Sequence, residues 1–443
     1  MLTPRQVAVP RRRSYLPPAW PLYVLFLGFP IWWVVGLSAF IWPIMAVPMA
    51  FWLLRNRHVF VPSGFGIWVG FLFWMFASGT QLDDAGKYFF FGYRASLYVS
   101  ATIILLYVFN MPRETLPDAR VIKLMAIFWI VVVMGGLLGV LLPTLTFTSV
   151  VETVLPGRFT SNDFLHLLVH PATSQLHDFL GYLAPRPQAP FVYANIWGAT
   201  FGLLIPFVIL GWKYSTSPTW RVVTAAAFII AIVPLIHSLD RGLWLSLGVG
   251  LVYAAVRQAL AGRARALRTI LIVIFTVLLV VYLTPLKTLV SDRFAHPHSN
   301  EGRLNLYQES VQVMFESPLL GYGSPLPSSD KPSGPQVGTQ GQVWMVLVSQ
   351  GIPGLILFMG WFLFQFWRLR WTSTEVGFWC HTLILIALIQ APFYDWLGAP
   401  LVVIMIAIAL ATREQLPSSR SAGRASTGSM PEGAPPIPGP RSP

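Results

Sequence analysis

The stretch SDRFAHPHSNEGRLNLYQESVQVMFESPLLGYGSPLP, residues 291–327, lies inside a polar insert that runs from Lys287 to Gln340 between two apolar segments. Most other apolar segments of the chain are joined by short connectors. A loop of this length that holds arginines, histidines and several carboxylates indicates a functional element rather than a connection.

An amphipathic helix is expected inside this insert. Four of its residues share one helical face: Leu304, Tyr307, Val311 and Met314. Asn300 is expected to cap the helix, and Pro318 is expected to end it. We expect the helix to lie on the membrane surface and to cover a site.

The rest of the chain has the composition of an integral membrane protein. Hydrophobic residues make up 55% and charged residues 11%, against about 25% charged residues in soluble domains. The predicted fold is all-α and polytopic, with about 12 transmembrane helices. The apolar segments are 20–36, 38–54, 59–78, 92–109, 123–147, 191–211, 222–238, 242–256, 269–286, 342–367, 376–394 and 398–412.

The distribution of basic residues predicts the orientation. Alternate connections carry most of the 30 lysines and arginines, which places both termini in the cytoplasm of a multi-pass plasma-membrane protein. The predicted organisation is a cytoplasmic segment 1–19, a transmembrane domain 20–412 and a disordered tail 413–443. The extracytoplasmic loops are expected at 148–190 and 287–341.

The net charge of +13 is therefore mainly a signal of topology. The basic residues are scattered over short connections and the tail, so no nucleic-acid partner is expected. The single cysteine, Cys380, lies in an apolar segment and is expected to pack there.

Arg241 lies in a very tight connection, HSLDRGLWL, between two apolar runs. It either pairs with the adjacent Asp240 or binds an anion. Arginine suits phosphate because its planar guanidinium donates two parallel hydrogen bonds.

Arg293 and Arg303 lie in the polar insert and could join Arg241 in a cluster that binds a diphosphate. A metal ion would be the alternative way to hold that charge. The chain contains neither HExxH nor CxxC, and His296 and His298 lack a third ligand. We expect no metal and no cofactor.

Four motifs together resemble the bacterial O-antigen ligases and their polymerase relatives. They occur in the family's order over about residues 190–360, and each is loose when taken alone. The motifs are PFVYANIWGATFGLLIPF (190–207), SLDRGLWLSLGVGL (238–251), EGRLNLYQESVQVMFESPLLGYG (301–323) and VWMVLVSQGIPGLILF (343–358).

The resemblance implies a metal-independent glycosyltransferase that moves a glycan from a polyprenyl-diphosphate carrier to a hydroxyl of a glycan, lipid or protein acceptor, on the outer face of the plasma membrane. Arg241 and Arg303 match the arginines expected to hold the diphosphate. Asn195 lies in the first motif and is expected to bind substrate.

One position departs from the family pattern. Alignment on Gly351 places Gln340 where the family has a histidine, and glutamine cannot take a proton at neutral pH. Gln340 is expected either to orient a substrate group or only to cap the following helix. His298 and Glu309 are further candidates for the catalytic role.

Two other functions fit the same sequence. Twelve spans also suit a transporter of a lipid-linked glycan or small anion, although no related halves are found and the charges gather on one face. Loss of the family histidine also fits a non-catalytic partner in envelope assembly. The sequence does not distinguish a ligase from a polymerase.

Overall fold

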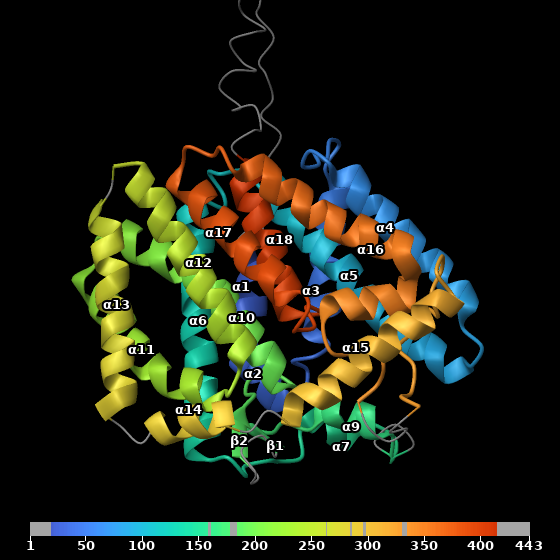
Figure 1. Cartoon of the computed structure of the whole chain (residues 1–443). Coiled ribbons are helices and arrows are strands. Elements are labelled where there is room, and N and C mark those ends of the chain that lie inside the picture. The colour runs from blue at the N-terminus through green and yellow to red at the C-terminus, as the bar shows by residue number, and fades with distance from the viewer. Residues whose placement is uncertain are drawn as a thin grey trace, which may run out of the picture.

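The computed structural model describes residues 19–157, 161–177, 184–262, 264–283, 286–295, 298–329 and 335–413. Over these residues the chain forms one bundle of helices (Figure 1). Residues 1–18 and 414–443 lie outside the described residues, and they include most of the tail that was expected to be disordered. Arg413 is packed in the fold: it donates to the carbonyl oxygen of Met111 at 2.7 Å and pairs with Asp118 at 3.1 Å.

Every apolar segment predicted from the sequence contains a helix. The first segment forms two helices, because Gly28 ends one and Pro30 lacks the amide hydrogen that a continuous helix would use. The elements are α1 (Trp20–Leu27), α2 (Phe29–Val35), α3 (Ile41–Arg55), α4 (Phe65–Ser78), the 3-10 helix η1 (Gly79–Gln81), α5 (Ala85–Asn110), α6 (Asp118–Leu141), α7 (Val150–Val154), α9 (Asp163–Val169), β1 (Ser174–His177), β2 (Ala184–Pro187), α10 (Ala194–Tyr214), α11 (Pro218–His237), α12 (Arg241–Leu260), α13 (Ala264–Leu283), α14 (Leu286–Ala295), α15 (His298–Glu316), α16 (Gln342–Leu369), α17 (Glu375–Gln390) and α18 (Ala399–Thr412).

Six helices among the described residues are long and apolar enough to cross a membrane: α5, α6, α10, α11, α12 and α16. The apolar helices α3, α17 and α18 have 15, 16 and 14 residues. An upright span needs about 20 residues. The protein is therefore a mostly helical membrane protein, and these six helices are the supported part of the roughly twelve predicted spans.

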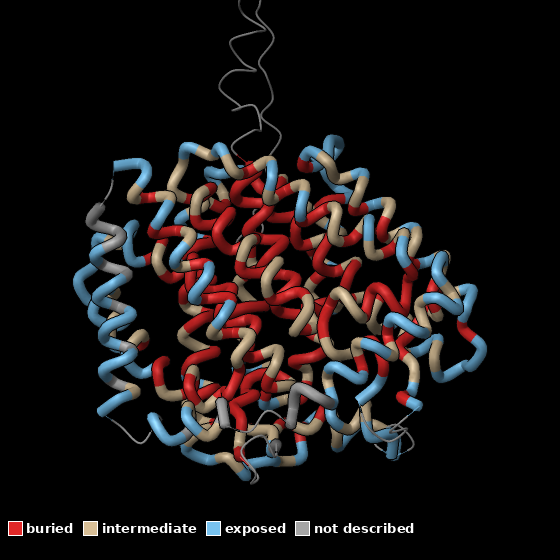
Figure 2. The backbone as a smooth tube through the Cα atoms, in the orientation of Figure 1, coloured by how far each residue is buried: buried red, intermediate tan, exposed pale blue. Residues whose placement is uncertain are grey.

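The helix α18 forms the centre of the bundle. All of its residues are buried, and it packs against α5, α10 and α17. Figure 2 shows this region as the largest block of buried backbone. A helix that is apolar on every side is typical of such a position. The helix α18 holds the loop 391–398 in place. This loop joins α17 to α18 and reaches the site described below.

The helix α16 is broken at Gly351, whose φ of 68° lies in the left-handed region. A Cβ atom at this position would lie 2.3 Å from the carbonyl oxygen of Leu319, so only glycine fits. The amide of Ile352 donates to the carbonyl oxygen of Pro318 at 2.9 Å, and that of Tyr322 donates to Val348 at 3.0 Å. The Pro-Leu-Leu-Gly-Tyr-Gly turn and the Gly-Ile-Pro-Gly segment therefore pack directly against each other.

The helix predicted inside the polar insert is α15, and Pro318 follows its end as expected. It begins at His298 rather than at Asn300. Of the four residues predicted to share one face, Leu304 and Val311 are exposed, whereas Leu306, which was outside that set, is buried. The helix has two apolar sides: one packs on α16, and the other is exposed and suits a membrane surface.

The described residues of the loop 148–190 form the short helices α7 and α9 and the paired strands β1 and β2. The strands β1 and β2 pair antiparallel, with Ser174 opposite Pro187. The all-α expectation missed this hairpin, because Pro185 and Pro187 made the segment unlike a strand. It lies with α7, α9 and α14 at one end of the bundle, and α15 covers the same end (Figure 1).

Candidate functional site

A cavity of about 700 Å³ lies between the bundle and the loops at this end. Its wall is formed by parts of α5, β2, α10 and α15, by the segment before α16 and by the loop 391–398. The charged and amide side chains that line it are Arg94, Gln175, Arg186, Asn195, Arg303, Asn305, Gln336, Gln340 and Asp395. Three residues predicted from the sequence, Asn195, Arg303 and Gln340, therefore line one cavity although they are far apart in the chain.

Arg186 on β2 bonds to residues of two other segments of the fold. Its side chain is buried, and its Nε donates to the carbonyl oxygen of Ser238 at 2.6 Å. Its Nη2 lies 2.8 Å from Oδ1 of Asp240 and 3.0 Å from Oδ1 of Asn195. The guanidinium therefore joins the hairpin to α10 and to the turn between α11 and α12.

The turn before α12 is strained. Leu239 has a φ of 54°, which is uncommon for a residue with a large side chain, and its side chain is buried. Asp240 at this turn pairs with Arg186. Arg241 is the first residue of α12 and lies close enough to Arg303 for the two charges to repel each other.

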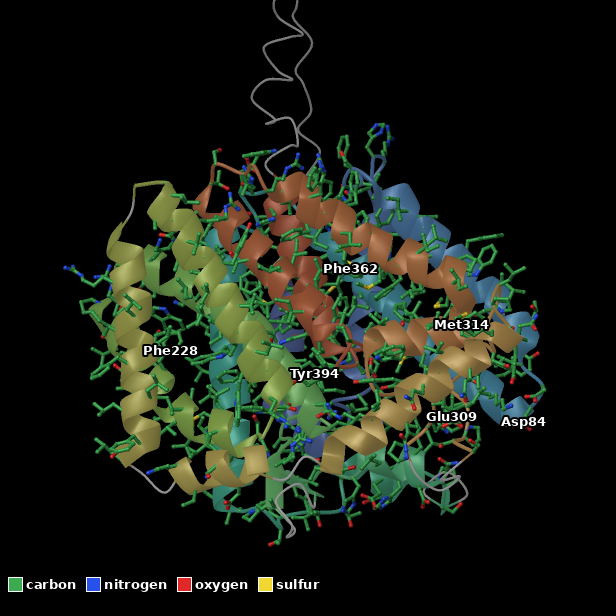
Figure 3. The ribbon with its side chains drawn as sticks, in the orientation of Figure 1. Asp84, Phe228, Glu309, Met314, Phe362 and Tyr394 are labelled. Carbon is green, nitrogen blue, oxygen red and sulfur yellow. The ribbon has the colours of Figure 1, made fainter. Side chains whose placement is uncertain are left out.

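Gly242, the second residue of α12, allows the close approach of a side chain from the loop 391–398. A Cβ atom there would lie 2.7 Å from Oη of Tyr394. Figure 3 shows Tyr394 beside α12. This contact fixes the loop 391–398 against the helix that begins with Arg241.

The helix α15 is anchored to the same loop. The ring of Tyr307 stacks on Trp344, with ring centroids 4.6 Å apart. The Tyr307 hydroxyl and the Trp344 indole nitrogen both donate to the carbonyl oxygen of Pro392, at 3.2 and 3.1 Å. Arg303 lies one turn before Tyr307, so these contacts hold its side chain at the cavity wall.

Gln340 lies two residues before α16, where the sequence placed it. The start of this helix is bound to the loop 391–398: the Gln342 amide donates to the carbonyl oxygen of Tyr394 at 2.8 Å. The side chain of Gln342 accepts from the Trp396 amide at 2.9 Å and donates to the Tyr98 hydroxyl at 2.7 Å. These bonds fix the first residue of the helix, Gln342, against the loop 391–398 and α5, and Gln340 lines the cavity.

Asp395 is the carboxylate that lines the cavity. Burial raises its pKa to about 6, although the backbone amide of Leu397 and the positive charge of Arg94 act to lower it. Tyr93 and Tyr193 also line the cavity near this carboxylate. A carboxylate with this pKa is mostly ionised at neutral pH and is still basic enough to accept a proton.

Arg94 lies in α5 and faces the same cavity. Its Nη1 atom is buried and makes no hydrogen bond with any residue that the structure describes. Its charge acts on Asp395 through space, without a direct ion pair in the described part of the chain. A guanidinium nitrogen that is buried without a protein acceptor can donate a hydrogen bond to a bound anion.

Glu309 on α15 has a different environment. Its Oε1 accepts from the amide and hydroxyl of Ser329 at 2.6 and 2.7 Å, and its Oε2 accepts from Ser328 at 2.8 Å. Burial acts to raise the pKa of Glu309, but these bonds lower it overall. Glu309, labelled on α15 in Figure 3, does not line the cavity, and its hydrogen bonds hold Ser328 and Ser329. The side chains of Arg293 and His298 lie outside the described residues, so their predicted roles stay predictions.

The sequence analysis did not single out Arg94, Arg186 or Asp395. A signal for Arg94 was present, because it interrupts the apolar run FFFGYRASLYVS and a charge within such a run marks a functional position by default. Asp395 is similarly flanked by aromatic residues in PFYDWLG. Arg186 had no local signal, because its partners come from two other segments.

Residues 226–359 match the model of the O-antigen ligase family. They form an O-antigen ligase domain. The matched range includes Arg241, Arg303 and Gln340, and it does not include Asn195, Arg94 or Asp395. No curated protein matches the chain. Together with its membrane helices, this O-antigen ligase domain identifies a membrane ligase of polysaccharide synthesis.

Proposed function

We propose that the protein transfers a glycan from a polyprenyl-diphosphate carrier to a hydroxyl acceptor on the outer face of the plasma membrane. The observation that carries this proposal is a single cavity that has Arg94 and Arg303 for an anion and Asp395 for a proton. In this orientation both termini are cytoplasmic, and the end of the bundle with α15 faces outward.

The diphosphate binds to the arginines. Arg94 offers a guanidinium nitrogen with no hydrogen bond to a described residue, and Arg303 lines the same cavity on α15, which is anchored through Tyr307. Arg241 adds positive charge beside Arg303, and Arg293 remains a candidate on the same loop. Such a cluster stabilises the charge of a leaving diphosphate in the way that a metal ion would, so the reaction needs no metal.

The acceptor hydroxyl binds near Asp395. Asp395 takes the hydroxyl proton as the acceptor oxygen attacks the anomeric carbon of the glycan. The bond from that carbon to the diphosphate oxygen breaks, and the polyprenyl diphosphate leaves with the electron pair. Gln340 orients the acceptor by hydrogen bonding, and Asn195 contributes an amide to the substrate. In this assignment Asp395 supplies the proton transfer that the family histidine would supply.

The direct test uses purified protein in lipid nanodiscs with a polyprenyl-diphosphate-linked oligosaccharide and a hydroxyl acceptor. We expect a glycosylated acceptor and free polyprenyl diphosphate from the wild type and from Arg120→Ala, an exposed control at the opposite end. Arg303→Ala should form little product. Movement of the intact donor across a bilayer with no product would indicate a transporter.

Analysis of envelope glycans in a deletion strain then distinguishes a ligase from a polymerase. Accumulation of a full-length carrier-linked polymer indicates a ligase. Accumulation of single carrier-linked repeat units indicates a polymerase.

A further inference from the structure

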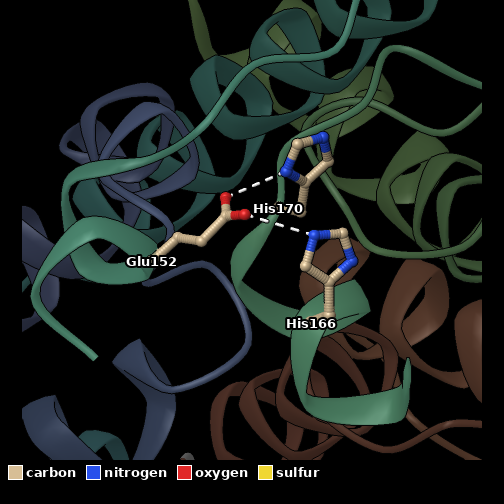
Figure 4. Close-up of side chains that lie close together, drawn as sticks. All are labelled: Glu152, His166 and His170. Atoms are coloured by element: carbon tan, nitrogen blue, oxygen red, sulfur yellow. Dashed lines mark hydrogen bonds and ion pairs between the residues drawn. The ribbon is translucent and has the colours of Figure 1, made fainter. Parts of the chain in front are cut away.

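Three potential metal ligands converge outside the cavity, in the loop 148–190. Oε1 of Glu152 lies 3.2 Å from Nε2 of His166, and Oε2 of Glu152 lies 2.9 Å from Nδ1 of His170 (Figure 4). One ligand atom from each residue lies within 4.8 Å of the other two. The two imidazole rings stack with their centroids 4.7 Å apart.

The glutamate is held in place by its own helix. Ser149 and Glu152 form a capping box at the start of α7: the Ser149 hydroxyl accepts from the Glu152 amide at 3.1 Å, and the Ser149 amide donates to Oε2 of Glu152 at 3.3 Å. The Ser149 hydroxyl also donates to the carbonyl oxygen of Val169 at 2.6 Å. The carboxylate is thus oriented toward α9 by contacts that do not involve either histidine.

The histidines come from consecutive turns at the end of α9. His166 lies within this helix, and His170 directly follows it, so the four-residue spacing puts both rings on one side. Zinc binds histidine nitrogen at about 2.0–2.1 Å and carboxylate oxygen at about 2.0–2.2 Å, so two such ligands on a tetrahedral ion lie about 3.3–3.5 Å apart. The two observed separations involve different oxygens of Glu152, so a tetrahedral ion that takes one of these oxygens requires rotation of the glutamate and histidine side chains.

We propose that Glu152, His166 and His170 bind one Zn²⁺ ion, with water as the fourth ligand. His166 is 43% exposed, which gives the ion an entry path and leaves room for the water. The role of this ion is to join α7 to α9. Phe164 and Leu168, also in α9, line the cavity, so the ion stiffens one wall of the site without taking part in glycan transfer.

The test measures zinc binding by chelator-treated protein, purified without a polyhistidine tag, at neutral pH. Isothermal titration calorimetry and elemental analysis should give one Zn²⁺ per chain for the wild type and for the control His58→Ala. The variants His166→Ala and His170→Ala should each bind zinc more weakly by more than about 100-fold, because even partners outside the ligand set change metal affinity 10–100-fold.

Glu152→Gln separates a metal site from a structural contact, because glutamine preserves the capping box and removes the ligand charge. It should melt like the wild type without zinc and should lose most of the increase in Tm that zinc gives the wild type. The proposal is overturned if the wild type binds no more zinc than a variant that lacks both histidines. None of these measurements depends on glycan transfer.

Discussion

Two pairs of opposite charge lie at the same end of the molecule and use their hydrogen bonds differently. Arg186 and Asp240 are both buried and directly paired at 2.8 Å, and Arg186 also bonds to Ser238 and Asn195. Arg94 and Asp395 act on each other through space, and Nη1 of Arg94 has no hydrogen bond with any described residue. The first pair holds the fold together, and the second keeps its bonding groups for a ligand.

The largest effect expected from this difference is on stability. Arg186→Ala leaves the carboxylate of Asp240 buried without its cation, which typically costs about 3–5 kcal/mol. The variant should therefore lose a large part of its folded, monodisperse fraction in a thermal unfolding assay monitored by size-exclusion chromatography. The double variant Arg186→Met/Asp240→Asn should recover part of the lost stability, because it no longer has a buried carboxylate without a cation. An Arg186→Ala protein that melts like the wild type would show that the pair is not structural.

The second pair should affect activity rather than folding. Asp395→Asn keeps the shape of the side chain and removes the base, so transfer should fall by about 10²–10⁴-fold. For the wild type, log(kcat/KM) should fall as the pH drops through about 6, because protonation of Asp395 removes the base form. This acidic limb should be absent from the residual activity of Asp395→Asn. If the limb persists in the variant, another group is the base.

The next largest loss of transfer activity is expected for substitutions of the arginines at the cavity. Arg94→Ala and Arg303→Ala should each reduce transfer by about 10²–10³-fold, the usual cost of one lost contact to a developing negative charge. Arg94→Lys, Arg303→Lys and Arg241→Lys should recover only part of the activity, because lysine lacks the planar guanidinium. Arg120→Ala serves as the matched control, and all variants should melt like the wild type.

These two pairs also show what the sequence could and could not predict. The α15 helix, its end at Pro318 and the arginine at its start followed from local patterns. The partners of Arg186 and the approach of Arg94 to Asp395 depend on segments that meet only in the folded chain. The apolar face that includes Leu304 was predicted, but the burial of Leu306 was not, because periodicity alone does not distinguish a side that packs on protein from one that faces lipid.

The smallest effect is expected at Gln340. It offers a neutral hydrogen bond, so Gln340→Ala should lower transfer by about tenfold, less than the loss of a charged contact. Gln340→His restores the family residue and should keep activity, with an added dependence on pH near about 6.5. Full activity of Gln340→Ala in the nanodisc assay would show that this position only precedes the helix that begins at Gln342.

The central claim is that the cavity between Arg94 and Arg303 holds the diphosphate of the donor. A cryo-electron microscopy map of the protein in a nanodisc with polyprenyl diphosphate tests it most directly. The account predicts density for two phosphates in this cavity, against the guanidinium groups of Arg94 and Arg303, and the loss of that density in Arg94→Ala. Phosphate density at another place on the bundle, with this cavity empty, would contradict it.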